Sequence, residues 1–249
     1  MTSAAAAIPA IVELTVRGLL SRRRSLIMLL LASLPVLLAL LIRLAGRGSN
    51  PVAIAATVLD DLVLRTVLPL VALVFGTAAL GSELEDGSGV YLLTKPVPRW
   101  QIVAAKLIGS AGLTIALIVP AAIAAGLLVA GDQGGGFQMT IAAAIAWSIA
   151  IVLYCALFLA LSIWTSRALI IGLVYTLIWE GVLAGLFEGT RLLSVRQYAL
   201  SIADALDPGT RLSGELDLVA AAAMTGFVLA AAAVLATQWL VTYQVRAPE

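Results

Sequence analysis

The chain contains no histidine, a single cysteine and only two lysines among its 249 residues, and these absences remove several kinds of chemistry. Without histidine there is no Ser-His-Asp hydrolase and no HExxH zinc site. Cys155 alone cannot form an internal disulfide, and it leaves no ordinary structural zinc site. Neither Lys95 nor Lys106 follows a glycine, so the sequence has no GxxxxGKS/T phosphate loop. We therefore expect the chain to bind no metal or cofactor and not to hydrolyse ATP itself.

Charge is also scarce. Only 12% of the residues are charged and 62% are hydrophobic, whereas a soluble domain has about 25% charged and about 45–50% apolar residues. The net charge of +1 argues against a nucleic-acid-binding protein, because there is no basic surface to neutralise phosphates. The apolar excess runs along the whole chain. This distribution predicts an all-α polytopic membrane protein in which residues 1–249 form a single transmembrane domain.

Six segments have the roughly 20 mostly apolar residues that a helix needs to cross a bilayer core about 30 Å thick. They cover approximately residues 26–42, 62–80, 107–130, 141–164, 168–187 and 218–241. The first run is longer than the apolar region of a signal peptide, so we interpret it as a span. Six spans place both termini on one side, which then carries nine basic residues against five on the other. This excess predicts cytoplasmic termini in a bacterial-type plasma membrane.

Residues 8–24, "IPAIVELTVRGLLSRRR", precede the first span and mix apolar with basic positions. The pattern predicts an amphipathic helix on the inner interface, with its arginines facing anionic headgroups. The alternative is a disordered basic tail that only sets the topology.

A polar, turn-rich insert, "GSELEDGSGVYLLTKPVPRW", separates the second and third spans at residues 81–100. Gly87 permits a helix break, Pro96 ends the short apolar run after it, and Pro98 suits the start of the next helix. The insert therefore predicts a short cytoplasmic helix between two rigid stems. Its apolar side chains have no cover in this chain, which is typical of a partner site; they are Val90, Tyr91, Leu92 and Leu93. The alternative is a loop resting on lipid.

The pattern E-x-x-D-G-S-x-x-x-L-L-x-K-P-V-x-R-W, from Glu83 to Trp100, resembles a signature of ABC-2 type transporter permeases. Ser88 and Gly89 depart from it, because many members have threonine and a larger residue there. The resemblance implies that the insert is a coupling helix that docks on a separate ATP-binding subunit, which holds ATP and Mg²⁺. The implied coupling residues are Glu83, Asp86, Gly87, Val90, Tyr91, Leu92, Leu93, Pro96 and Arg99.

The same resemblance implies that two permease subunits pair, as a homodimer or a heterodimer. It also implies that their second and fifth spans line the route for a hydrophobic or amphipathic substrate such as a drug or a lipid. Glu180 lies in the predicted fifth span, where a charge is expensive and usually faces a cavity or a partner. We assign Glu180 to the translocation route, with an interfacial ion pair as the alternative.

Two further features lie near the predicted outer side. Asp61 and Arg65 are spaced i,i+4, which favours a structural ion pair over a substrate gate. The segment 191–210 carries periodic apolar residues and ends in Asp207-Pro208-Gly209. It predicts one or two short amphipathic helices, which either close an outer gate, as the resemblance implies, or form an interfacial cap.

Two functions remain open at this point. The first is the permease subunit of an ATP-driven exporter, in which a separate chain supplies the ATP chemistry. The second is an ATP-independent secondary transporter or channel-like protein. Ion-coupled carriers need intramembrane acids or broken half-helices near the midplane, and Glu180 is the one candidate. An intramembrane enzyme is poorly supported, because there is no histidine and no pair of membrane acids.

Overall fold

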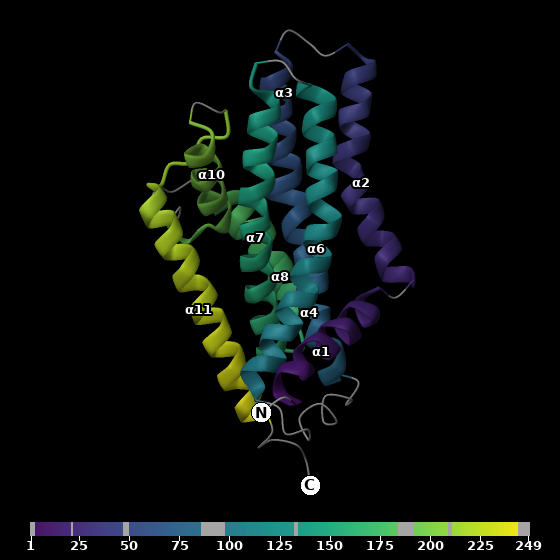
Figure 1. Ribbon diagram of the computed structural model, residues 1–249, viewed down its shortest axis with the longest axis vertical. Helices are drawn as coiled ribbons and strands as arrows, with labels where there is room; N and C mark the ends of the chain where they lie inside the picture. The colour runs from purple at the N-terminus through teal and green to yellow at the C-terminus, as the bar shows by residue number, and fades with distance from the viewer. Residues whose placement is uncertain are drawn as a thin grey trace.

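The computed structural model describes residues 3–20, 22–46, 50–85, 98–131, 134–183, 192–208 and 211–243. Within these ranges all regular secondary structure is helical, and no strand is present. The helices run mostly along one long axis and form a bundle (Figure 1). The predicted all-helical architecture is therefore confirmed for the described part of the chain.

The described helices follow one another along the chain. Their bounds are α1 Ser3–Leu19, α2 Arg22–Leu44, α3 Pro51–Thr57, η1 Val58–Val67, α4 Leu68–Glu85, α6 Arg99–Ala130, α7 Gly136–Trp164, α8 Ala168–Val174, η2 Tyr175–Leu183, α10 Val195–Leu206 and α11 Leu218–Tyr243. The two η elements are π-helical. They continue their neighbours without a break, so α3, η1 and α4 form one long helix, and α8 and η2 form another.

Among the described residues, five helices are long and apolar enough to cross a membrane. They are Arg24–Leu44, Pro51–Gly81, Arg99–Ala130, Gly136–Trp164 and Leu218–Leu240, and each overlaps one of the predicted spans. The second begins eleven residues before the predicted boundary at Leu62. Asn50 caps its first turn by accepting a hydrogen bond from the backbone N–H of Ala53 at 3.1 Å, and Pro51 occupies the first position. Asp60 and Asp61 interrupt the apolar run without interrupting the helix, which is why the sequence boundary fell too late.

The predicted fifth span, residues 168–187, corresponds to α8 and η2, and the described helix ends at Leu183. Its apolar part, Ala168–Val182, is shorter than the five candidate spans. One end lies beside Gly81, since Ala168 and Gly81 line the same small cavity. Near the other end, the carbonyl of Gly181 accepts a hydrogen bond from Arg65. The helix thus lies alongside residues 65–81 of its neighbour. A count of six spans stays a prediction.

The core of the bundle lies around α7. This helix packs against α4, α6, α10 and α11, and it carries the fully buried side chains Trp147 and Tyr154. In the most apolar stretch of α7, 67% of the residues are buried inside the chain, against 11% for α11. Helices α2 and α11 lie on opposite flanks of the bundle (Figure 1). Their apolar surfaces are available to lipid or to a second subunit.

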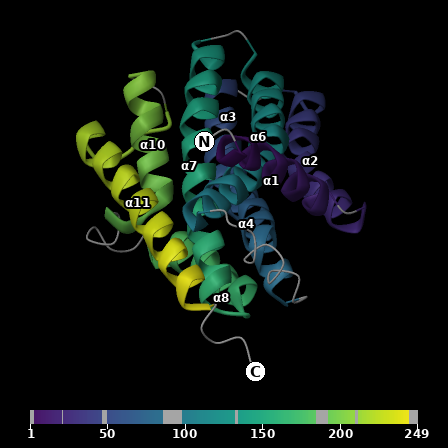
Figure 2. The ribbon, with the colours of Figure 1, turned by 60° about the horizontal axis from the view of Figure 1, so that its bottom comes forward.

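Helix α1 lies across the lower end of the bundle rather than along it (Figures 1 and 2). It packs on α6 and α4, and the buried residues Thr15 and Leu19 are one turn apart on that side. The close fit is visible at Gly109, where a Cβ atom would lie 3.0 Å from Thr15 Cγ2. The predicted helix of residues 8–24 needs corrected bounds, because α1 ends at Leu19 and the arginines from Arg22 onward begin α2.

Candidate functional site

The predicted coupling segment lies mostly outside the described residues. Of the nine residues assigned to it, the seven from Asp86 to Pro96 fall in the range 86–97, which is not described. Glu83 belongs to the last turn of α4, and Arg99 is the first residue of α6, directly after Pro98. Helices α4 and α6 pack against each other, so the segment connects neighbouring helices at the end of the bundle where α1 lies (Figure 1). The coupling roles of all nine residues remain predictions.

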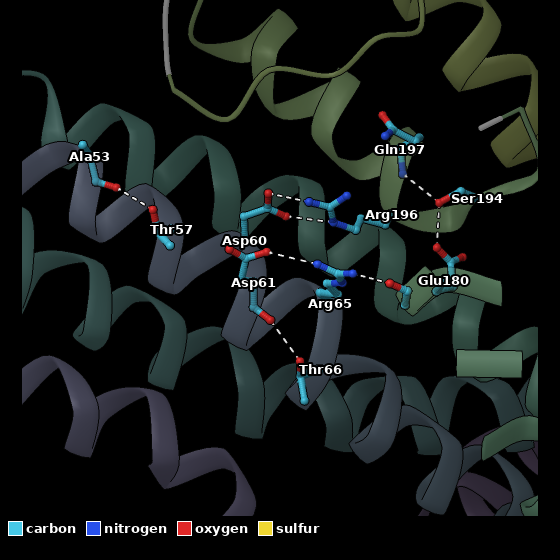
Figure 3. Close-up of polar contacts among 11 residues, drawn as sticks. Ala53, Thr57, Asp60, Asp61, Arg65, Thr66, Glu180, Ser194, Arg196 and Gln197 are labelled. Atoms are coloured by element: carbon cyan, nitrogen blue, oxygen red, sulfur yellow. Dashed lines mark hydrogen bonds and ion pairs between the residues drawn. The ribbon is translucent and has the colours of Figure 1, made fainter. Parts of the chain in front are cut away.

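A second polar region lies in the half of the bundle farther from α1, where η1, η2 and α10 meet. We call it the charged cluster and define it by six residues, Asp60, Asp61, Arg65, Glu180, Ser194 and Arg196. Figure 3 shows that these side chains come from three elements and point toward one another. Only three of the six, Asp61, Arg65 and Glu180, were singled out from the sequence.

Asp60 and Arg196 join η1 to α10 although they lie 136 positions apart in the chain. The guanidinium donates from Nε to Oδ1 at 2.9 Å and from Nη2 to Oδ2 at 2.6 Å (Figure 3). Two parallel charge-assisted bonds of this kind fix orientation as well as distance. Both side chains are largely buried, with 20% of Arg196 and 23% of Asp60 exposed. The pair therefore compensates a carboxylate that would otherwise sit uncompensated within an apolar helix.

Arg65 connects η1 to η2. Its Nη1 atom lies 3.6 Å from Asp61 Oδ1, and its Nη2 atom donates to the backbone carbonyl of Gly181 (Figure 3). The ion pair predicted from the i,i+4 spacing is thus present. The contact to Gly181 could not be predicted, because it depends on how two distant helices pack.

Glu180 is almost fully buried, with 3% of its surface exposed. Its Oε1 atom accepts hydrogen bonds from the backbone N–H of Val195 at 2.8 Å and from the Tyr175 hydroxyl at 3.2 Å. Its Oε2 atom accepts a hydrogen bond from the Ser194 hydroxyl at 2.6 Å (Figure 3). All three donors belong to this chain. The route-lining role of Glu180 stays a prediction.

The carboxylate of Glu180 helps to cap the N-terminus of α10. Val195 is the first residue of that helix, and Ser194 is its N-cap, whose hydroxyl oxygen accepts from the backbone N–H of Gln197 at 3.4 Å. The first N–H groups of a helix lack internal partners, and a negative charge there also interacts favourably with the helix dipole. Glu180 therefore anchors α10 to η2.

Helix α10 is the amphipathic helix predicted in the segment 191–210. It ends at Leu206, with Asp207 as its C-cap, and it packs on α7 and α11. Tyr198 is buried on its inner side, and its hydroxyl donates to the carbonyl of Leu192. Burial and the nearby Glu180 raise the pKa of Tyr198, so the hydroxyl stays protonated and can donate. A gating role and a capping role for α10 are both predictions.

Two of the three helices that contribute to the charged cluster, η1 and η2, are π-helical, and they pack against each other. Within η1, the Thr66 hydroxyl donates to the carbonyl of Asp61, five residues earlier, at 2.9 Å (Figure 3). π-Helical turns are uncommon and are found frequently at functional sites. Two of them in contact, bridged by Arg65, make this the most unusual backbone region among the described residues.

Sequence reasoning missed Asp60, Ser194 and Arg196. In the sequence, Arg196 is one of the five basic residues on the predicted outer side, and an acid in an apolar run requires a nearby cation. Asp60 and Arg196 fall on the same predicted side of the membrane and carry opposite charges. This complementarity is the sequence signal for their ion pair. Ser194 directly precedes an apolar periodic segment, which is the ordinary position of an N-cap.

A comparison with protein families matches residues 21–243 to the model of the ABC-2 family transporter proteins. The match covers nearly the whole chain, from the start of α2 to the end of α11. A search of curated proteins found no significant match. The family, the five candidate spans and the bundle of apolar helices agree with one another. The chain belongs to the ABC-2 family of transporter proteins and is an integral membrane permease of an ABC transporter.

Proposed function

We propose that this chain is the membrane subunit of an ATP-driven exporter for a hydrophobic or amphipathic substrate. In this proposal two permease subunits form the route, and a separate ATP-binding subunit supplies ATP and Mg²⁺. The observation that carries the proposal is the family match over residues 21–243, because proteins of this family are generally paired with an ATP-binding subunit. The chain's own sequence has no phosphate loop, which agrees with a division of labour.

The lengths of two helices support coupling through residues 86–97. The candidate span Pro51–Gly81 has 31 residues and α6 has 32, which corresponds to about 46–48 Å of helix. A bilayer core is only about 30 Å thick, so both helices extend beyond it. The ends of α4 and α6 that flank residues 86–97 would act as stems. Closure of an ATPase dimer against that segment would tilt the stems and, through them, the rest of the two helices.

The proposed topology has six spans and cytoplasmic termini in a bacterial-type plasma membrane. Helix α1 and the last described turn of α11 lie at the same end of the bundle, which suits an even number of crossings (Figure 1). Helix α8 with η2 would provide the sixth crossing, because it runs from the level of Gly81 to the level of Arg65.

Glu180 would contribute to the route through the helix that carries it. The three hydrogen bonds of its carboxylate hold it toward the chain's own interior. The other face of the same helix exposes apolar side chains, including Leu177, Ile178 and Val182. This exposed face would meet the second subunit or the substrate, and Glu180 would fix its position relative to α10.

Purification of the tagged full chain from native membranes tests the proposal. We expect an ATP-binding protein and a second permease copy to co-purify, and the complex to hydrolyse ATP after reconstitution into proteoliposomes. A chain that purifies without any ATP-binding protein and still transports under an ion gradient would support the ATP-independent alternative and reject the proposal.

A further inference from the structure

An open pocket of about 420 Å³ lies beside the charged cluster. It is lined by Ala53, Ala56, Thr57, Asp60, Asp61 and Arg211. The first five come from successive turns of α3 and η1, and Arg211 comes from the segment that precedes α11. Figure 3 shows Thr57, Asp60 and Asp61 following one another along this helix. The pocket therefore combines two carboxylates with one guanidinium from another part of the chain.

If the bilayer core ends at Gly81, the length of the helix places the pocket at the depth of lipid headgroups. The candidate span that contributes most of its lining runs from Pro51 to Gly81, and a helix needs only about 20 residues to cross the bilayer core. Twenty residues counted back from Gly81 reach Leu62. Asp60 and Asp61 then lie at the boundary of the core, and Ala53 to Thr57 lie beyond it, at the end of the bundle opposite α1.

The charged side chains of the pocket differ in how closely they are paired within the chain. Both carboxylate oxygens of Asp60 accept hydrogen bonds from Arg196. Asp61 is 55% exposed, and its ion pair with Arg65 is longer, at 3.6 Å. Arg211 is exposed and has no ion pair within the described part of the chain. The groups most accessible to a ligand are therefore the exposed carboxylate of Asp61, whose contact with Arg65 is long, and the exposed guanidinium of Arg211.

We propose that this pocket binds the zwitterionic headgroup of a phospholipid, with its ammonium at Asp61 and its phosphate at Arg211. A headgroup that carries both charges compensates both side chains, whereas a purely anionic headgroup compensates only Arg211. The guanidinium favours phosphate because its N–H groups match the geometry of phosphate oxygens. Ala53 and Ala56 form the apolar part of the pocket lining.

Native mass spectrometry of the purified full chain can measure this binding directly. The probes are phosphatidylethanolamine, phosphatidylglycerol and free phosphoethanolamine. We expect phosphatidylethanolamine to bind at least about tenfold more tightly than phosphatidylglycerol, the difference that one charge-assisted contact supplies. The measurement needs no ATP-binding subunit, so its outcome does not depend on the proposed function.

Variants separate the two contacts. Asp61→Asn should weaken phosphatidylethanolamine binding to the level of phosphatidylglycerol and leave the latter unchanged. Arg211→Gln should weaken both lipids. Thr57→Trp fills the pocket without changing its charge and should block phosphatidylethanolamine. This variant is an independent test, because it leaves Asp61 and its pair with Arg65 in place. Arg167→Gln, an exposed arginine after α7 at the opposite end of the bundle, is the matched control and should change neither affinity.

Three results would overturn the proposal. Equal affinity of the wild type for phosphatidylethanolamine and phosphatidylglycerol would show that the pocket does not prefer a zwitterionic headgroup. Unchanged phosphatidylethanolamine binding in Arg211→Gln and Thr57→Trp would place the lipid elsewhere. Free phosphoethanolamine bound as tightly as the lipid would identify a site for a soluble solute rather than a membrane headgroup.

Discussion

Single residues of the charged cluster hold helices together that lie far apart in the chain. Glu180→Gln removes the charge of a buried carboxylate and leaves one carbonyl oxygen for three donors. A buried donor left without a partner costs about 1–3 kcal/mol, so the free energy of unfolding should fall by that amount. Thermal unfolding of the purified protein in detergent measures the change. Glu13→Gln on α1 is the control, because its pair with Arg17 is exposed and should contribute little. Equal stability of Glu180→Gln and wild type would contradict the anchoring role.

Asp60 and Arg196 provide a second test at this scale, by a double-mutant cycle with Asp60→Asn, Arg196→Gln and the double variant. We expect a coupling free energy of about 1.5–3 kcal/mol, because the two bonds are charge-assisted and largely shielded from water. The same cycle on Glu13 and Arg17, an exposed i,i+4 pair, should give about 0.3–0.5 kcal/mol. Coupling at Asp60 and Arg196 no larger than in the control pair would show that α10 is held by other contacts.

At the scale of the element, α10 depends on its N-terminus. Ser194→Ala removes both the N-cap and the hydroxyl that donates to Glu180. Loss of an N-cap costs about 1 kcal/mol, and we expect faster hydrogen exchange of the α10 amides while α7 remains protected. Ser33→Ala on α2 removes an exposed hydroxyl bonded only to its own helix, so it should leave α10 unchanged. Exchange in α10 that does not respond to Ser194→Ala would mean that packing on α7 and α11 is sufficient.

The sequence predicted elements better than their ends and their partners. Runs of apolar residues identify the candidate spans because the bilayer requires length and hydropathy in any fold. The start of the second span was placed at Leu62 because Asp60 looks like the end of an apolar run, and only the fold shows that Arg196 compensates it. Glu180 was recognised as unusual by its position. Its partners Ser194 and Val195 follow from tertiary packing, which no local pattern contains.

For the whole molecule, the account requires that both termini lie in the cytoplasm. In a Cys155→Ala background, single cysteines introduced at Ser3 and Ala247 should react with a membrane-impermeant thiol reagent only after the cells are permeabilised. A cysteine at Thr57 should react in intact cells, because that residue is exposed at the other end of the bundle. Labelling of either terminus in intact cells would reverse the proposed orientation.

The central claim is that a separate ATP-binding subunit docks on residues 86–97, and crosslinking in native membranes tests it most directly. The chain would carry Leu92→Cys in a Cys155→Ala background and would be treated with a thiol-to-amine crosslinker. The account predicts a product that contains a protein with a phosphate loop. It also predicts that Leu92→Asp with Leu93→Asp abolishes both co-purification and ATP-driven transport, and that a cysteine at Leu206, at the far end, gives no such product. A Leu92→Cys chain that yields no ATP-binding protein, together with an intact complex in the double aspartate variant, would contradict the account.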